Sequence, residues 1–147
     1  MGSPPVFAGY KLMEVFLMPS SIQTLRRKRS EHKKLVEKLD KVVREIIKAR
    51  DKKCVTCGNT QGLQCGHLFS RSAFSTRWDL RNCNAQCYPC NFRHELDSYP
   101  YNKWFITKYG QKEWDRLHLR YSTAERWTEV RLQEKQTILE AVLRGMI

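Results

Sequence analysis

Two pairs of cysteines give this sequence its clearest chemical signal. Cys54 and Cys57 stand in the run CVTC, Cys87 and Cys90 stand in CYPC, and 29 residues separate the two pairs. Two residues between cysteines let both thiolates reach one tetrahedral ion, and four thiolates leave that ion no open position. The spacing therefore predicts a structural zinc site and makes a redox role for either pair the weaker interpretation.

Two further cysteines, Cys65 and Cys83, lie between these pairs. Either of them could replace one of the four as a ligand. A free cysteine behaves as a small apolar side chain, however, so we expect both to be buried free thiols. Because the N-terminal residues lack the features of a signal peptide, we expect a cytosolic protein. Thiols stay reduced in that compartment, so six cysteines suit metal binding rather than disulfides.

A histidine and two asparagines lie among these cysteines or directly after them, and side chains of these types could take part in phosphodiester hydrolysis. His67 lies in the run CGHLFSR, Asn82 lies in RWDLRN, and Asn91 directly follows the last cysteine. An imidazole titrates near neutral pH and can act as the general base that activates a water molecule. Mg²⁺ and Mn²⁺ prefer oxygen ligands, and Asn91 carries a carbonyl oxygen.

The same order resembles that of the HNH (ββα-metal) nucleases over residues 54–110. The pattern CGHLFSR…TRWDLRN…QCYPCN is closer to that of the phage NinG/Rap-type recombination nucleases. The second CxxC pair with Asn directly after it is also similar to the arrangement in endonuclease VII-type junction resolvases. The resemblance implies a hairpin-plus-helix site, one divalent ion and hydrolysis of DNA that is often branched. It makes His67 the base and Asn91 a metal ligand. It also implies that Asn82 braces the loop and orients the histidine, and that Arg71 grips a phosphate.

One position departs from that pattern. HNH sites often carry an acidic or imidazole ligand immediately before the base, where this chain has Gly66. We expect Glu95 to supply the missing carboxylate, because it lies four residues after Asn91 and shares its face if this segment is helical. The weaker candidates are Asp79, Asp97, His94 and Cys65.

Each of these residues also has an ordinary structural interpretation. A lone histidine is usually a hydrogen-bonded structural residue, and asparagine is common in turns and helix caps. Arg71 and Glu95 are of types that usually lie on the solvated surface. Their combined order inside a four-cysteine clamp on a basic chain favours the catalytic interpretation.

A long basic helix is expected before the two cysteine pairs, over residues 20–53. Apolar residues from Leu35 to Ile47 recur at steps of three and four, which is typical of an amphipathic helix. From 21 to 53 there are 13 Lys and Arg against five Asp and Glu, or +8 of the chain's net +12. This density of positive charge favours contact with DNA phosphates. The candidate DNA-binding residues are Arg26, Arg27, Lys28, Arg29, Lys33 and Lys34.

Residues 54–110 should form the zinc-clamped core. We expect strands around LQCGHLF, a looser return through STRWDLRN, and a short helix that carries Asn91 and Glu95. The aromatic residues from Trp104 to Trp114 could stack on bases, but their helical spacing favours a place in the core.

Residues 111–147 should be helical. Gly110 and Gly145 are placed to end helices, and the run STAE predicts a capping box between Ser122 and Glu125. The helix that follows should bury one stripe, consisting of Trp127, Val130, Ile138 and Val142, with Leu139 and Leu143 beside it.

The composition fits this arrangement. A chain of 147 residues fits one domain, whose small core benefits from a metal staple. A net charge of +12 and a pI near 9.7 indicate a polyanionic partner. Residues 1–19 are expected to be an apolar leader or a tag-derived segment. Their apolar run is too short for a membrane span and lacks the features of a signal peptide.

The sequence therefore predicts an α+β protein in which a small zinc-stapled ββα-metal core is flanked by an N-terminal basic helix and C-terminal helices. We expect a Mg²⁺- or Mn²⁺-dependent endonuclease that acts on branched DNA of a phage in the cytoplasm of the bacterial host, without a membrane partner. Two alternatives stay open: a non-catalytic zinc module that binds DNA or acts as a scaffold, and an HNH homing or packaging nuclease. A homodimer is also left open, because the basic helix can pair with a second copy or pack on the core.

Overall fold

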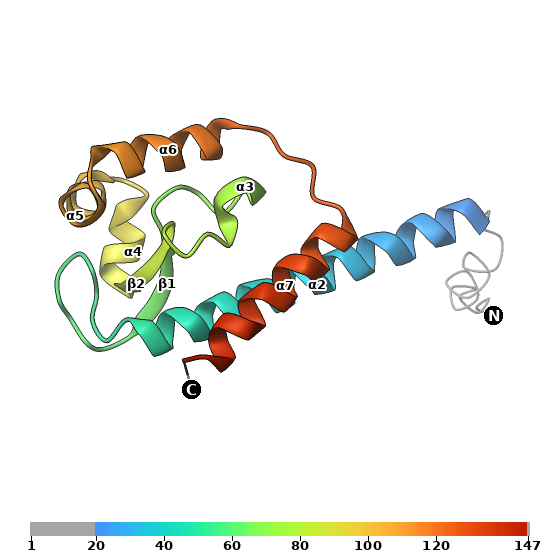
Figure 1. The fold of residues 1–147 in the computed structure, drawn as a ribbon, viewed down its shortest axis with the longest axis horizontal. Helices are drawn as coiled ribbons and strands as arrows, with labels where there is room; N and C mark the ends of the chain where they lie inside the picture. The colour runs from blue at the N-terminus through green and yellow to red at the C-terminus, as the bar shows by residue number, and fades with distance from the viewer. Residues whose placement is uncertain (1–19, 147) are drawn as a thin grey trace, which may run out of the picture.

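The computed structural model describes residues 20–146, which form a mixed α and β fold in which helices surround a two-stranded sheet (Figure 1). The leader expected at residues 1–19 lies outside the described residues. Within the described range, no helix combines the length and the apolar character that crossing a bilayer requires. In chain order the elements are α2 (Ser20–Arg50), β1 (Leu63–His67), α3 (Phe74–Arg77), β2 (Cys83–Cys87), α4 (Tyr88–His94), α5 (Tyr99–Tyr109), α6 (Gln111–Ser122) and α7 (Glu129–Arg144).

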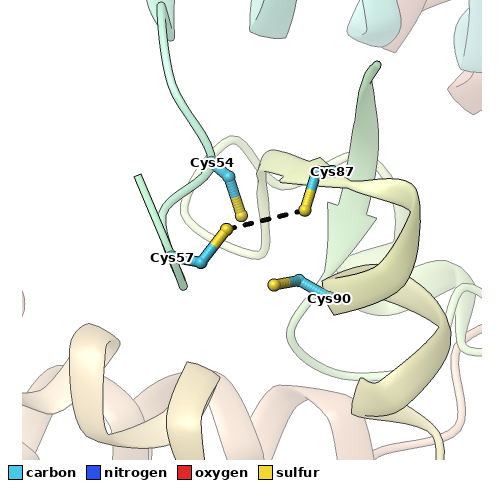
Figure 2. A group of neighbouring side chains, drawn as sticks. All are labelled: Cys54, Cys57, Cys87 and Cys90. Carbon is cyan, nitrogen blue, oxygen red and sulfur yellow. Dashed lines mark hydrogen bonds between the residues drawn. The ribbon is translucent and has the colours of Figure 1, made fainter. Parts of the chain in front are cut away.

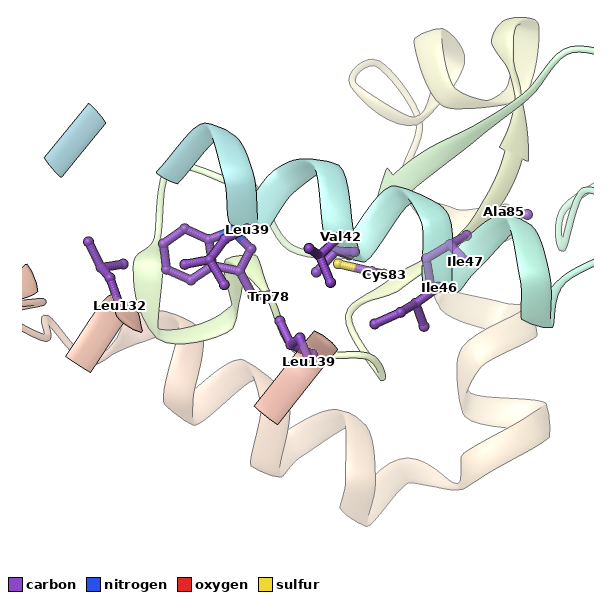
Figure 3. Packing of buried hydrophobic residues seen from close by; sticks show 10 residues of the cluster. Leu39, Val42, Ile46, Ile47, Trp78, Cys83, Ala85, Leu132 and Leu139 are labelled. Carbon is purple, nitrogen blue, oxygen red and sulfur yellow. The ribbon is translucent and has the colours of Figure 1, made fainter. Parts of the chain in front are cut away.

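The long helix α2 and the last helix α7 run side by side and share the first hydrophobic core (Figures 1 and 3). Leu39 and Ile46 of α2 are buried in one cluster with Leu132 and Leu139 of α7, and Trp78 from the segment between the strands belongs to the same cluster. The apolar positions of α2 thus face the core, as their spacing predicted.

Two antiparallel strands, β1 and β2, form the centre of the fold. Leu63 pairs with Cys87 at one end of the hairpin, and His67 pairs with Cys83 at the other. Every residue of β2 is buried, whereas β1 is partly open to solvent. Because side chains alternate along a strand, Cys65 and His67 share one face of the hairpin. β2 continues into α4 without a loop.

Arg50, the last residue of α2, ties this helix to the hairpin. Its guanidinium donates hydrogen bonds to the backbone oxygens of Leu80 and Cys83, at 2.7 and 2.9 Å. Asp51 pairs with the same guanidinium and accepts a backbone N–H of β2 at 2.9 Å. Burial acts to raise the pKa of Asp51, but these contacts outweigh it and lower the pKa. The helix therefore ends at Arg50 rather than at residue 53, because these two side chains bind the start of β2.

A second hydrophobic cluster joins the hairpin to α5 and α6. Its buried members are Leu68, Phe69, Tyr101, Phe105 and Leu117. Trp104, Tyr109 and Trp114 pack against this cluster, which confirms that the aromatic residues belong to the core. α5 ends at Gly110, whose φ of +86° strains a residue with a side chain, and the chain turns there directly into α6.

The capping box predicted for Ser122 and Glu125 is wrong. Ser122 is the last residue of α6, where its hydroxyl donates to a backbone oxygen one turn earlier at 3.0 Å. α7 begins only at Glu129, and Thr128 caps it by accepting the backbone N–H of Arg131 at 3.3 Å.

The stripe predicted for this last helix is also wrong in part. Val130 and Ile138 are 63% and 58% exposed, whereas Leu132 and Leu139 are buried in the core shared with α2. A helix with apolar residues on two faces offers two stripes of the same period, and contact with α2 selects one of them. Gly145 follows the last residue of α7, as predicted.

Candidate functional site

The four cysteines of the two CxxC pairs converge in the structure (Figure 2). Cys54 and Cys57 lie in the segment that follows α2, Cys87 ends β2, and Cys90 lies in the first turn of α4. Their Sγ atoms all lie within 4.8 Å of one another, and those of Cys57 and Cys87 are 3.6 Å apart. Four sulfurs bound to one tetrahedral zinc ion lie about 3.8 Å apart, so this cluster can hold the ion.

The surroundings of the cluster suit thiolates that share a cation. All six cysteines are free. Burial acts to raise the pKa of Cys54, but hydrogen bonds from the backbone of Cys87, Cys57 and Thr56 outweigh it and lower the pKa to about 7. Burial and the three neighbouring sulfurs raise the pKa of Cys90, so this thiol stays protonated at neutral pH unless a cation joins the cluster. With four thiolates around it, an ion here stabilises the fold rather than meeting a substrate.

An open pocket of about 750 Å³ lies between the hairpin, α2 and α4, and Asn91 of its lining directly follows Cys90 of the cluster. Six of the residues singled out in the sequence line it: the main candidates His67, Arg71, Asn91 and Glu95, and the weaker candidates Cys65 and His94. His67 ends β1, Arg71 follows in the next loop, and Asn91 lies in α4. Glu95 comes directly after the last residue of α4, so this helix is shorter than predicted, yet the side chain still lines the pocket.

His67 is held in one tautomer by a backbone contact. Its Nε2 lies 3.0 Å from the backbone oxygen of Arg77. A carbonyl oxygen only accepts hydrogen bonds, so in the neutral ring Nε2 carries the proton and Nδ1 keeps its lone pair. Burial lowers the pKa of His67 below 6.5, against the opposing effects of the Arg77 contact and of the charge on Asp40. The imidazole is therefore neutral at pH 7, with one basic nitrogen.

Asp40 and Arg77 belong to this site, although the sequence analysis missed both. The guanidinium of Arg77 donates two hydrogen bonds to the carboxylate of Asp40, at 2.9 and 2.6 Å, and the indole of Trp78 donates a third at 2.8 Å. Burial acts to raise the pKa of Asp40, but these donors outweigh it and lower the pKa. The network fixes the residue whose backbone oxygen contacts His67. The available signal was an acidic residue next to Leu39, within the apolar stripe of the helix.

Asn82 does not line the pocket but braces the segment that leads into it. The side chain is fully buried. Its Oδ1 accepts the backbone N–H of Phe69 at 2.8 Å, and its Nδ2 donates to the backbone oxygens of Phe69 and Thr76 at 2.9 and 3.1 Å. Phe69 lies two residues after His67, so this asparagine fixes the chain immediately beyond the histidine.

The part of α4 that lines the pocket offers further ligand atoms. Asn91 donates through Nδ2 to Oε1 of Gln64 at 3.2 Å, which leaves its carbonyl oxygen available. Nε2 of His94 contacts the backbone oxygen of Leu68 at 3.0 Å, and its buried Nδ1 has no hydrogen-bond partner among residues 20–146. Asn91, His94 and Glu95 thus bring two oxygen donors and one imidazole nitrogen to the same pocket, which makes His94 a stronger candidate than the sequence suggested.

Gly66 is required by packing against the second strand. A Cβ on this residue would lie 2.2 Å from Oε1 of Gln86. Gln86 is buried and donates from its Nε2 to the hydroxyl of Thr56 at 2.8 Å. Strand alternation also turns this position to the face opposite His67. A carboxylate for the pocket must therefore come from another part of the chain, such as Glu95.

The cysteine cluster and the pocket lie within the segment that a protein-family model matches. That model, described as bacteriophage lambda NinG protein, matches residues 20–146. The chain belongs to this family. Two curated proteins named protein ninG, from Escherichia phage 933W and Enterobacteria phage VT2-Sa, are each 29% identical to it over 98 residues. The match covers 63% of this NinG-family chain and 48% of each relative, so the chain spans about half the length of the curated relatives it matches. No solved structure matches the chain.

The candidate DNA-binding residues of this NinG-family chain stand apart from the pocket. They lie on the exposed N-terminal half of α2, which extends beyond α7 (Figure 1). Arg27 and Lys33 lie 3.7 and 3.9 Å from glutamates one turn later. Arg44 and Lys48 of the same helix line the pocket, and the sequence analysis missed them. At about 1.5 Å per residue, Arg29 and Arg44 are about 22 Å apart along the helix axis.

Proposed function

We propose that this NinG-family protein is a metal-dependent DNA endonuclease that hydrolyses phosphodiesters in branched recombination intermediates. One observation carries the proposal. His67, with one free basic nitrogen, lines the same pocket as Asn91, His94 and Glu95, on a strand–strand–helix unit joined to four clustered cysteines. The order of these residues resembles that of an HNH site.

In this proposal His67 activates the attacking water molecule. Nδ1 accepts the proton, because Nε2 is committed to the backbone oxygen of Arg77. The ring becomes an imidazolium, and the negative charge of Asp40 favours that form. A positioned base of this kind contributes roughly 10²–10⁴-fold to a hydrolytic rate.

In the same proposal, other residues of the pocket bind the phosphate. Mg²⁺ or Mn²⁺, when bound, supplies the Lewis acid that stabilises charge on the phosphoryl oxygens. Asn91 and Glu95 would hold it through oxygen and His94 through Nδ1. Arg71 and Arg44 line the same pocket and can donate hydrogen bonds to phosphate oxygens.

The distribution of positive charge supports a substrate recognised by its shape. Lysine and arginine contacts to phosphates position a protein on DNA but carry no sequence information. The first basic residues of α2, as far as Arg29, lie at least about 22 Å along the helix axis from Arg44 of the pocket, so the two regions would contact separate parts of the DNA. This arrangement favours a branched substrate with more than one duplex arm.

The test compares three proteins: the wild type, His67→Ala and His118→Ala. Each is incubated with linear, flapped and four-way DNA, with and without Mn²⁺, and nicking is measured. His118 is exposed and does not line the pocket, so its variant controls for the loss of a histidine. The wild type and His118→Ala should nick branched DNA, and His67→Ala should be roughly 10²–10⁴-fold slower while the four-cysteine cluster keeps its zinc. Full activity in His67→Ala would remove His67 as the base, whereas no nicking by the wild type on any substrate would favour a non-catalytic DNA-binding zinc module instead.

A further inference from the structure

The hairpin carries a second cluster of metal-binding side chains. Cys65, His67 and Cys83 each offer one ligand atom, and these three atoms lie within 4.8 Å of one another. Cys65 and His67 are two residues apart on β1, and His67 pairs directly with Cys83 on β2. None of the three is a member of the four-cysteine cluster, so a zinc ion there does not account for their proximity.

The three side chains are held by regular structure and can be reached from the pocket. Cys83 is fully buried in the first core, whereas Cys65 and His67 line the pocket. The backbone oxygen of Arg77 lies 3.0 Å from Nε2 of His67 and 3.3 Å from Sγ of Cys83. This oxygen already joins two of the three ligand residues, so the cluster needs little rearrangement to surround an ion.

Two sulfurs and one imidazole form a ligand set for a thiophilic ion rather than for Mg²⁺. Zinc binds sulfur and nitrogen, and sites with three protein ligands leave a fourth position for water. Mg²⁺ prefers oxygen. We propose that Cys65, His67 and Cys83 form a second site for Zn²⁺ or a similar thiophilic divalent ion. Binding releases the proton of each thiol to solvent.

An ion at this site would remove the basic nitrogen of His67. A neutral imidazole has one nitrogen with a lone pair and one that carries a proton. If Nδ1 binds the ion, the lone pair is used directly. If Nε2 binds it, the ring proton resides on Nδ1, and again no base is left. Thiophilic ions therefore inhibit nicking, a consequence that rests on the proposed nuclease function, whereas the site itself does not.

Metal counting on the full chain tests the site without any activity assay. Reduced protein that holds one zinc ion per chain is titrated with Co²⁺, whose thiolate complexes absorb in the near ultraviolet, and bound ions are counted after gel filtration. We expect two thiophilic ions per wild-type chain and one in Cys65→Ala and Cys83→Ala, without the absorption of the second site. Ser70→Ala, which changes a pocket residue outside the cluster, should still bind two. A wild type that never exceeds one ion, or a Cys65→Ala variant that still binds two, overturns the site.

Inhibition tests the consequence. Micromolar Zn²⁺ added at saturating Mn²⁺ should slow wild-type nicking at least tenfold and leave Cys65→Ala unaffected. Equal inhibition of both would overturn the link between the second site and His67. The two proposals can fail separately. A wild-type chain that binds two thiophilic ions but does not nick DNA would contradict the nuclease proposal. A chain that nicks DNA but binds only one such ion would contradict the second site.

Discussion

The imidazole of His67 lies at the end of a chain of polar contacts that begins on another helix. Asp40 of α2 accepts two hydrogen bonds from the guanidinium of Arg77, and the backbone oxygen of the same arginine lies 3.0 Å from Nε2 of His67. Arg77 thus contacts the carboxylate with its side chain and the histidine with its backbone. Asp40 does not touch the reacting atoms in the proposed reaction, so we regard it as a positioning residue.

These contacts predict the pH dependence of nicking. A general base must be neutral, and burial lowers the pKa of His67 below 6.5, so activity should persist below that pH and fall only once the lowered pKa is passed. The negative charge of Asp40 raises this pKa, so Asp40→Asn should move the acid limb to still lower pH while reducing kcat. The measurement is kcat/KM against pH on four-way DNA at saturating Mn²⁺. A purely structural role for Asp40 would lower activity without moving the limb, and a wild-type limb above pH 6.5 would contradict the assignment of His67.

Among the elements, those with a strong local pattern could be predicted from the sequence. The CxxC spacing predicted which four sulfurs meet, and the period of apolar residues predicted the core-facing side of α2. The buried face of α7 could not be predicted from its sequence pattern. Its buried Leu132 and Leu139 are seven residues apart and its exposed Val130 and Ile138 are eight apart. Both intervals keep a pair on one helix face, and only the packing of α2 distinguishes the two pairs.

The parts of the site that were missed depend on contacts between distant residues. Asp40 and Arg77 are 37 residues apart and carry no shared motif. Cys65 and Cys83 were expected as separate buried thiols, but Cys65 is only half-buried and the two lie together with His67. Their proximity follows from the register of the hairpin, since a slip of one residue would turn a whole strand to the other face. Register is set by tertiary packing, which the local sequence does not report.

The four-cysteine cluster lies outside the core between α2 and α7, which predicts how zinc removal affects each part of the fold. None of the four clamping cysteines belongs to the core between α2 and α7. Chelation should therefore loosen residues 54–60 and α4, with amide exchange accelerated at least tenfold there, while α7 keeps its protection. Hydrogen exchange followed by mass spectrometry resolves these segments. Equal acceleration in α7 would show that the ion supports the whole fold rather than one end of it, and re-addition of zinc should restore the original pattern.

At the scale of the whole molecule, two groups of positively charged residues carry the proposed contacts with DNA. One is the exposed N-terminal half of α2, and the other is the pocket, which Arg44, Lys48 and Arg71 line. In the proposed function the first region gives affinity and the second binds the phosphate that is cut. Substitutions in the first region should therefore change binding and its salt dependence without changing the rate of cleavage of bound DNA.

Arg26 and Arg29 allow this separation to be tested, because they lie three residues apart and neither is in an ion pair within the described part of the chain. Each lost phosphate contact lowers the slope of log K against log salt concentration by about 0.9, so Arg26→Gln with Arg29→Gln should lower it by about 1–2. Lys112→Gln with Arg144→Gln, on α6 and at the end of α7, removes the same charge elsewhere and should leave the slope unchanged. Fluorescence anisotropy with labelled four-way DNA between 50 and about 200 mM salt gives the slopes, and single-turnover nicking at saturating protein gives the rate. A lowered single-turnover rate would place these arginines in the cleavage step, and equal slopes for the two double variants would mean that the exposed half of α2 does not contact the DNA.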